Sequence, residues 1–235
     1  MNKKTIIFSL ILLIILGGIV WYLSEKNGRF ETASIKDIVR RENSGNNSND
    51  SKKTLESQEI IIGNPAAPVT MIDYSQYTCP HCVNFHKNIF PLIMENYIKS
   101  GKVKILPRRL GPSALVLAVI CGNKQGKFQE TDDYIFNHVA DLLEQTQQTN
   151  SADEVRPILT EWLNKLAQSL NLELASFNQC LNSTDGTEQI QDWLNEAHQN
   201  EISGTPTFLI NGQKIIGNQP YIKFEELIEK ELNKK

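Results

Sequence analysis

The sequence is poor in cysteine, with 4 in 235 residues, and has no large excess of either charge, with 24 Lys and Arg against 27 Asp and Glu. Four cysteines are too few, in so long a chain, for a small scaffold held together by disulfides. With 13 Gly, 9 Pro and 40% hydrophobic residues, the composition is not that of a disordered, collagenous or many-spanning membrane chain. The length allows one or two domains, and the positions of the cysteines carry more information than their number.

The charge is unevenly distributed along the chain. Residues 1–57 hold 9 Lys and Arg and 6 Asp and Glu, a net of +3, whereas residues 58–235 hold the remaining 15 and 21, a net of −6. A protein that binds a phosphate backbone needs a basic face, which the second segment does not offer. Nucleic acid is therefore not the expected partner.

A hydrophobic run lies at the N-terminus. After a lysine pair, the uncharged segment Thr5–Leu23 has 19 residues, and at ~1.5 Å per residue it would span roughly 28 Å, close to the ~30 Å hydrocarbon core. It is longer than the apolar part of a signal peptide, no small-residue cleavage pattern follows, and Trp21 and Tyr22 suit a membrane interface. We predict a signal-anchor transmembrane helix over residues 1–23, with a cleaved secretory signal as the alternative.

Either kind of signal exports the rest of the chain. With the lysine pair on the cytoplasmic side, the positive-inside rule places everything after Leu23 outside. Residues 24–57 are polar and cannot bury enough apolar surface to offset chain entropy, which predicts a flexible tether. We expect a cell-envelope protein, anchored in the inner membrane, with its folded part in the periplasm or extracytoplasmic space, where disulfides persist.

The folded part begins with strand and helix patterns in alternation. Short strands are predicted at Ile60–Ile62, Val69–Tyr74 and Val103–Leu106. Between the last two lies a helical pattern, Cys82–Lys99, in which Pro91 predicts a kink or a break. A strand, a helix and a strand in this order imply a parallel pair joined by a right-handed crossover.

The second half of the chain is mainly helical and then returns to strands. Asn211 and Gly212 lie between two apolar runs and predict a hairpin, because both residues tolerate positive φ; an amphipathic helix follows at Tyr221–Leu232. Helical periodicity covers residues 114–121, 128–143, 155–170, 174–181 and 190–198, which is too much helix for one crossover. The predicted organisation is a first α/β part at 58–112, an inserted helical domain at 113–200, and a second α/β part at 201–235.

Cys79, Pro80, His81 and Cys82 follow a predicted strand and open a predicted helix. Two intervening residues on a helical first turn bring the two sulfurs within bonding distance. The free N–H groups and positive dipole end of the helix favour a thiolate at Cys79, and a protonated His81 would add positive charge. The pKa of this thiol is therefore expected below its usual ~8.5. A stabilised thiolate stabilises the reduced protein, so the disulfide of the oxidised protein is readily transferred to a pair of substrate thiols.

A zinc site and a structural disulfide are the competing interpretations of this motif. A zinc site normally needs a second close cysteine pair or a histidine pair. Cys121 and Cys180 are 59 positions apart, and although His86 stands four residues after Cys82, a fourth ligand is not evident. A structural disulfide seldom spans so tight a loop at a helix start. We favour a redox-active pair and expect no metal.

Three motifs together make a family resemblance specific: Asp73, then Cys79-Pro80-His81-Cys82, then Gly204-Thr205-Pro206-Thr207 before a strand and hairpin. In this combination the chain resembles the DsbA-type thiol–disulfide oxidoreductases of the thioredoxin superfamily, over about residues 59–232. The resemblance implies an α/β thioredoxin fold with an inserted helical domain, preceded here by a transmembrane helix and a flexible tether.

The resemblance also implies roles for single residues. Cys79 would be the exposed nucleophile and Cys82 its buried partner. Pro206 would be a cis-proline facing the disulfide, and Thr205 would offer its backbone to a bound polypeptide. Asp73 would lie beneath the cysteines, where burial would raise its pKa and let it accept the proton of Cys82; the alternative is a solvated carboxylate without a role.

Cys121 and Cys180 both fall on apolar faces of predicted helices. In an oxidising compartment they are expected to form a structural disulfide in the inserted domain, as some DsbA-like relatives do, with two unpaired buried cysteines as the alternative. Four cysteines allow three pairings, and the sequence alone does not choose among them. The remaining conspicuous residues are predicted to pack or to be solvated: His86, His138, His198, Trp162, Trp193 and the strand end Arg108-Arg109.

The expected function is that of a monomeric, membrane-tethered thiol oxidase. It would donate the Cys79–Cys82 disulfide to reduced, newly exported polypeptides and would need no cofactor. By resemblance, a quinone-linked membrane protein of the DsbB type would reoxidise it. The alternatives are a disulfide isomerase or reductase of the same fold, with the opposite redox poise, and a redox-silent binding module on a thioredoxin scaffold.

Overall fold

The computed structural model describes residues 59–149 and 151–234. They belong to one compact unit, Glu56–Lys235. The predicted signal anchor at 1–23 and the predicted tether at 24–57 lie outside the described residues. Within the described ranges, no helix combines the length and the apolar character that crossing a membrane requires.

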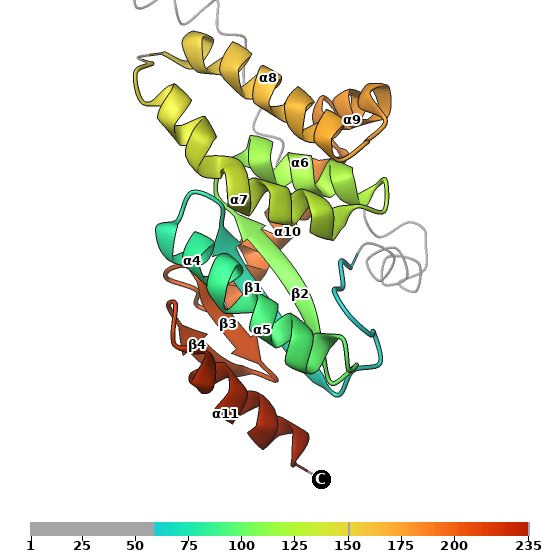
Figure 1. The fold of residues 1–235 in the computed structure, drawn as a ribbon, viewed down its shortest axis with the longest axis vertical. Coiled ribbons are helices and arrows are strands. Elements are labelled where there is room, and N and C mark those ends of the chain that lie inside the picture. Colours follow the sequence, from blue (N-terminus) through green and yellow to red (C-terminus); the bar gives the residue numbers. More distant parts are fainter. Residues whose placement is uncertain (1–58, 150, 235) are drawn as a thin grey trace, which may run out of the picture. The chain divides into compact units, whose positions relative to one another are not determined.

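A mixed four-stranded sheet lies at the centre of the described residues, in the order β2–β1–β3–β4 (Figure 1). β1 (Val69–Gln76) runs parallel to β2 (Val103–Leu110) and antiparallel to β3 (Thr207–Ile210), which pairs with β4 (Gln213–Ile216). β3 is buried at every position, because the centre of the sheet is covered on both faces. In β4, half-buried and exposed residues alternate, as expected for an edge strand.

Two strand predictions differ from the structure. The expected edge strand Ile60–Ile62 forms only an isolated antiparallel bridge, between Ile62 and Ile105. Gly63 follows with a φ of +100° and turns the chain out of the pairing. β2 is longer than predicted and continues through Pro107. Proline is tolerated there because β2 is an outer strand of the sheet.

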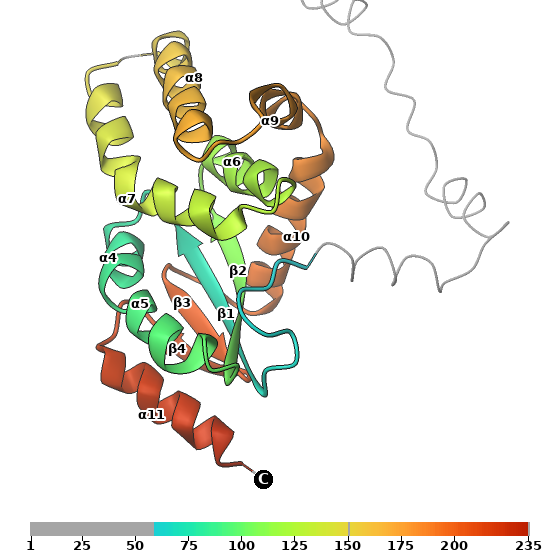
Figure 2. The same ribbon diagram turned by 45° about the vertical axis from the view of Figure 1, so that its right-hand side comes forward.

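Helices cover both faces of the sheet (Figure 2). On one face lie α4 (Pro80–Asn88), α5 (Phe90–Ile93), the π-helical turn η1 (Met94–Ile98) and α11 (Tyr221–Leu232). On the other face lies α10 (Asp185–Gln199), whose Glu196 accepts a hydrogen bond from the Tyr74 hydroxyl of β1 at 2.8 Å.

The predicted break at Pro91 and the predicted hairpin are both confirmed. α4 ends at Asn88 and α5 begins at Phe90 with Pro91 in its first turn, where a missing N–H is tolerated. Asn211 and Gly212 join β3 to β4 with φ values of 44° and 84°. Both values lie in the left-handed region that this turn requires.

The inserted segment supplies α6 (Ser113–Asn123), α7 (Phe128–Thr146), α8 (Ala152–Ser169) and α9 (Leu174–Leu181) before α10. These helices match the five predicted helical segments. Cys121 of α6 and Cys180 of α9 are joined by a disulfide. Gly122 lets α6 approach α7 closely, because a Cβ at this position would lie 2.1 Å from the Thr131 hydroxyl oxygen.

Candidate active site

The motif Cys79-Pro80-His81-Cys82 lies at the start of α4, shortly after the end of β1 (Figure 2). Cys79 is the N-cap residue, with extended backbone angles, and Pro80 occupies the first helical position. Both cysteines are free thiols; Cys79 is half-buried and Cys82 is buried. His81 is exposed on the same turn. Cys79 is therefore partly accessible to solvent, whereas Cys82 is enclosed in the core.

Burial raises the pKa of the Cys79 thiol, but hydrogen bonds outweigh it and lower the pKa overall. Three residues provide these bonds: Cys82 through its backbone N–H and its thiol, Thr205 through its side chain, and His81 through its backbone N–H. The backbone donors are the free N–H groups of a helix start, as the sequence predicts. The thiolate of Cys79 is thus more stable than the thiolate of an ordinary cysteine.

The pKa of Cys82 moves in the opposite direction. Burial, a hydrogen bond to Cys79 and the charge of Cys79 raise the pKa of Cys82 to about 12. The Gln76 N–H, which lies 3.4 Å from the sulfur, and the Thr205 side chain lower this pKa in part. Desolvation disfavours the charged form of a thiol. Cys82 therefore holds its proton more tightly than an ordinary thiol, whereas Cys79 holds its proton less tightly.

The loop before β3 faces the first sulfur. The Cys79 sulfur lies 3.4 Å from the Thr205 carbonyl oxygen, and the Thr205–Pro206 peptide bond is cis. The carbonyl of Pro206 accepts a hydrogen bond from the Gly217 N–H at 2.8 Å, and the Thr207 hydroxyl donates to the Gly204 carbonyl at 2.7 Å. The two predicted site segments, 126 residues apart, thus meet at Cys79.

Asp73 is completely buried on β1, but the prediction that its pKa is raised is wrong. Burial acts to raise the pKa, yet Arg109 and His86 hold it well below its usual range. One carboxylate oxygen accepts a hydrogen bond from Arg109 at 2.8 Å and faces the His86 Nε2 at 3.2 Å; the other accepts from the Ser75 hydroxyl at 2.5 Å. Asp73 is therefore a permanent anion rather than a store for a proton.

The prediction that Arg108 and Arg109 form a solvated strand end is also wrong, because both side chains are buried. Arg109 donates to both carboxylate oxygens of Asp132 on α7, each at 2.7 Å. The Tyr77 hydroxyl donates to Asp132 at 2.6 Å. Arg108 binds Glu196 at 2.6 Å and Glu59 at 2.8 Å. A signal was present in the sequence: Asp73 and Arg109 lie on neighbouring parallel strands with opposite charges.

His86 is buried too, which is one of the two environments, packed or solvated, that the sequence predicts for it. Its ring stacks on Phe136 of α7, with centroids 3.7 Å apart and planes 11° apart. Its Nε2 faces Asp73, whereas its Nδ1 is buried with no hydrogen-bond partner among the described residues. His138 and His198 are exposed and Trp162 and Trp193 are buried, as expected.

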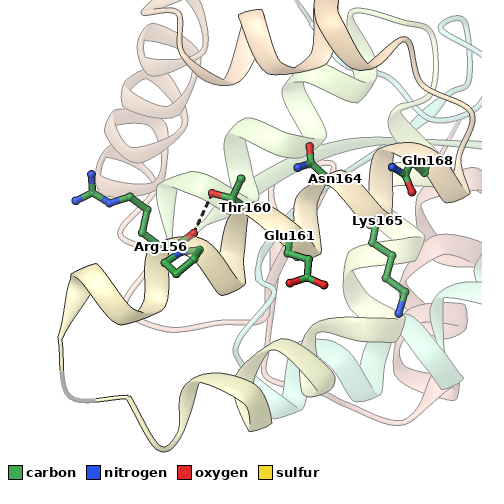
Figure 3. A pocket seen from close by; sticks show the side chains of 7 residues that line it. Arg156, Thr160, Glu161, Asn164, Lys165 and Gln168 are labelled. Carbon is green, nitrogen blue, oxygen red and sulfur yellow. Dashed lines mark hydrogen bonds between the residues drawn. The ribbon is translucent and has the colours of Figure 1, made fainter.

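Two hollows lie away from the cysteine pair. A cleft of about 330 Å³ between α4–η1 and α7 is lined by His86, Lys87, Phe90, Pro91, Met94, Gln129, Asp133 and Asn137. A larger hollow of about 880 Å³ runs along α8 and contains no predicted site residue. Figure 3 shows its polar side chains, among them Thr160, whose hydroxyl donates to the Arg156 carbonyl at 2.9 Å. Among residues 59–149 and 151–234, no three acidic, histidine or cysteine side chains are grouped to hold a metal ion.

Comparisons with known proteins agree with this geometry. A family model described as thioredoxin matches residues 55–230. Disulfide bond formation protein D of Bacillus subtilis is 26% identical over 196 residues, covering 81% of this chain and 84% of that protein. A Rickettsia typhi protein, provisionally named a protein-disulfide oxidoreductase, is 28% identical over 160 residues, which are 67% of this chain and 56% of that relative's length. The crystal structure of Wolbachia pipientis α-DsbA1 matches with a TM-score of 0.64 and 26% identity, over 75% of this chain and 92% of that one.

Proposed function

Because the chain belongs to the thioredoxin family and to the DsbA-like oxidoreductases of that superfamily, we propose that it oxidises exported polypeptides by donating a Cys79–Cys82 disulfide. The observation that carries the proposal is the opposite pKa shift of the two sulfurs. The half-buried sulfur of Cys79 is stabilised as an anion, which makes it a better leaving group, and the buried sulfur of Cys82 is stabilised as a thiol.

The reaction begins from the oxidised pair. A substrate thiolate attacks the Cys79 sulfur, the Cys79–Cys82 bond breaks, and its electron pair passes to Cys82, which takes up a proton. A second substrate thiolate then attacks the mixed disulfide, so the substrate disulfide forms and Cys79 leaves as a thiolate. The substrate loses two electrons and two thiol protons, and the protein gains the two electrons; no cofactor beyond the disulfide takes part.

Thr205 and Pro206 would hold the substrate during this exchange. The Thr205 carbonyl lies 3.4 Å from the Cys79 sulfur, and extended polypeptides bind through main-chain hydrogen bonds. The Thr205 side chain also bonds to both sulfurs. Substrate binding and thiolate stabilisation would therefore share one residue.

We further propose that the protein acts outside the cytoplasm as a monomer, tethered by residues 1–23, and that a quinone-linked membrane protein of the DsbB type removes its electrons. The apolar segment Thr5–Leu23 and the polar residues 24–57 support the tether. Fractionation of cells expressing the full chain tests it. We expect recovery with membranes after an alkaline wash, and recovery in the soluble extracytoplasmic fraction would instead mean a cleaved signal.

The direction of exchange is tested with glutathione buffers and a reduced two-cysteine peptide. Wild-type protein should oxidise the peptide, Cys79→Ser should be inactive, and Cys82→Ser should accumulate a mixed disulfide with an oxidised peptide. His138→Gln, at an exposed position on α7, is the control. If the Cys79–Cys82 pair stays oxidised in mostly reduced glutathione, the protein is a reductase. If the Cys79 thiol has a pKa near ~8.5 and does not exchange with glutathione, the protein is a redox-silent module.

A further inference from the structure

The cleft between α4–η1 and α7 has the size of a small-ligand site. Its volume of about 330 Å³ falls within the ~300–1,000 Å³ range of such sites in proteins. α7 crosses over α4 and α5 in Figure 2, and the stacked rings of His86 and Phe136 join α4 to α7. Its lining among the described residues contains neither redox cysteine, so we treat the cleft as a separate site. It combines apolar side chains with polar ones: Phe90, Pro91, Met94, and His86, Lys87, Gln129, Asp133, Asn137.

The buried part of the lining can accept a hydrogen bond but has none to give. The Nε2 of His86 lies 3.2 Å from a carboxylate oxygen of Asp73. Since a carboxylate only accepts, Nε2 carries the proton of the neutral ring, and Nδ1 is an acceptor. This Nδ1 is buried and has no hydrogen-bond partner among the described residues. The spare hydrogen-bonding capacity of the imidazole is therefore that of an acceptor.

Asp133 is the acid of the cleft. It is half-buried, and no described residue forms an ion pair or a hydrogen bond with its carboxylate. Burial and the neighbouring charge of Asp132 raise the pKa of Asp133 to about 6. Lys87 also lines the cleft, but it is exposed, and its flexible stem keeps the ammonium group in water. A cation bound beside Asp133 would stabilise a carboxylate that the protein itself leaves unpaired.

The charges behind the cleft also favour a cation. Asp73 and Asp132 share the single guanidinium of Arg109, so this buried group carries one net negative charge. The charged and titratable groups around Asp133 come from four elements: Asp73 on β1, Arg109 on β2, His86 and Lys87 on α4, and Glu130 and Asp132 on α7. Acids outnumber bases among them when the imidazole is neutral, and such an imbalance attracts positive ligands.

The apolar part of the lining selects the kind of cation. Phe90 offers an aromatic ring beside Pro91 and Met94, and a planar guanidinium stacks on aromatic faces while donating in a fork to a carboxylate. An ammonium group is a strongly hydrated point charge and gains less from such a surface. We propose that this cleft binds a guanidinium group, with the Asp133 carboxylate as its anionic partner and Phe90 as its stacking surface. This site is additional to the proposed redox function.

Isothermal titration calorimetry of the full-length protein at about pH 7 and constant ionic strength tests the proposal. Butylguanidinium should bind saturably at one site, butylammonium should bind more weakly, and N-acetyl-citrulline amide, a neutral isostere of arginine, should not bind. N-acetyl-arginine amide distinguishes the two sources of a guanidinium. If it binds as well as butylguanidinium, the cleft accepts an arginine side chain of a polypeptide; if only butylguanidinium binds, the ligand is a free small molecule.

Two variants at the cleft should change the affinity for butylguanidinium in opposite directions. Asp133→Asn should weaken binding tenfold or more, because it removes the charge from the charge-assisted hydrogen bonds. Lys87→Gln should strengthen binding, because it removes a competing positive charge. Asp141→Asn, at an exposed position on the same helix α7, is the matched control and should leave the affinity within twofold.

The pH dependence of wild-type binding is a further measurement. Since Asp133 has a pKa of about 6, its ionised fraction falls about tenfold between pH 7 and pH 5, and the affinity should fall with it. The proposal is overturned by no saturable binding at ~10 mM ligand, by equal binding of the citrulline compound, or by an affinity of Asp133→Asn within twofold of wild type. If Asp133→Asn does not fold, weaker binding in Lys87→Gln or an affinity unchanged at pH 5 overturns it. Binding is measured directly, so the outcome does not depend on disulfide exchange.

Discussion

Replacing Arg109 with Met removes the cation that Asp73 and Asp132 share. The guanidinium makes three charge-assisted hydrogen bonds of 2.7–2.8 Å to these two carboxylates, and all three side chains are buried. Removing one partner of a buried ion pair costs about 3–5 kcal/mol, because the remaining charge is left without compensation in a medium of low polarity. This is a large share of the ~5–15 kcal/mol by which domains of this kind are stable.

The loss of stability in Arg109→Met should depend on pH, and the direction of this dependence follows from the pKa of Asp73. In the wild type, the pKa of Asp73 is lowered, so its contribution to stability is present above the unfolded value of ~3.9 and is retained until the pH falls through the lower folded value. Without Arg109, burial raises the folded pKa of Asp73. The cost of burying this carboxylate is then complete at neutral pH and shrinks in acid, where protonation neutralises it.

Urea unfolding of wild type and Arg109→Met at about pH 7 and about pH 4.5 measures both effects. Arg156→Met is the matched control, since the Arg156–Asp153 pair is 77% and 92% exposed and such pairs contribute about 0–1 kcal/mol. A deficit below about 1 kcal/mol at neutral pH, or one that does not shrink in acid, would refute the assignment of a stabilising buried network.

Three further predictions concern the cysteines. The unfolding free energy of the reduced protein should rise relative to that of the oxidised protein as pH rises to about 8.5, because the folded state lowers the pKa of Cys79; Cys79→Ser, which cannot form the redox disulfide, should lack this pH-dependent gain in denaturant titrations. Thr205→Val should raise that pKa, seen in the ultraviolet absorbance of the thiolate, and should change the glutathione equilibrium roughly tenfold or more, since hydrogen bonds to charged groups contribute about 1.5–3 kcal/mol. Cys121→Ala/Cys180→Ala opens a loop of 59 residues and should cost about 4 kcal/mol in urea unfolding, with peptide oxidation unchanged.

The parts of the fold that follow from local pattern were predicted well. Helical periodicity located the helices of the inserted segment, Pro91 marked the break between α4 and α5, and Asn211-Gly212 marked the hairpin. Each of these signals depends on neighbours within a few residues. The Ile60–Ile62 strand failed because a strand also needs a partner along its length, and only Ile62 has one.

The charges of the core were predicted least well. When each residue is considered alone, Arg109 is predicted to lie at a solvated strand end. Asp73 is predicted to be a carboxyl group whose pKa is raised by burial. The structure places them 2.8 Å apart and adds Asp132 from α7 and His86 from α4. The sign of a pKa shift depends on which charges lie within a few ångströms, and those neighbours come from four separate elements.

The sequence by itself determined the chemistry at the helix start, because the cysteines, the proline between them and the free N–H groups of the first turn lie within four consecutive residues. Only the tertiary structure decided what surrounds that chemistry: Thr205 beside Cys79, the disulfide between α6 and α9, and the imidazole of His86 between Asp73 and a cleft. Backbone conformation and helix-end electrostatics are short-range properties of the chain, whereas desolvation and charge pairing depend on segments that folding brings together.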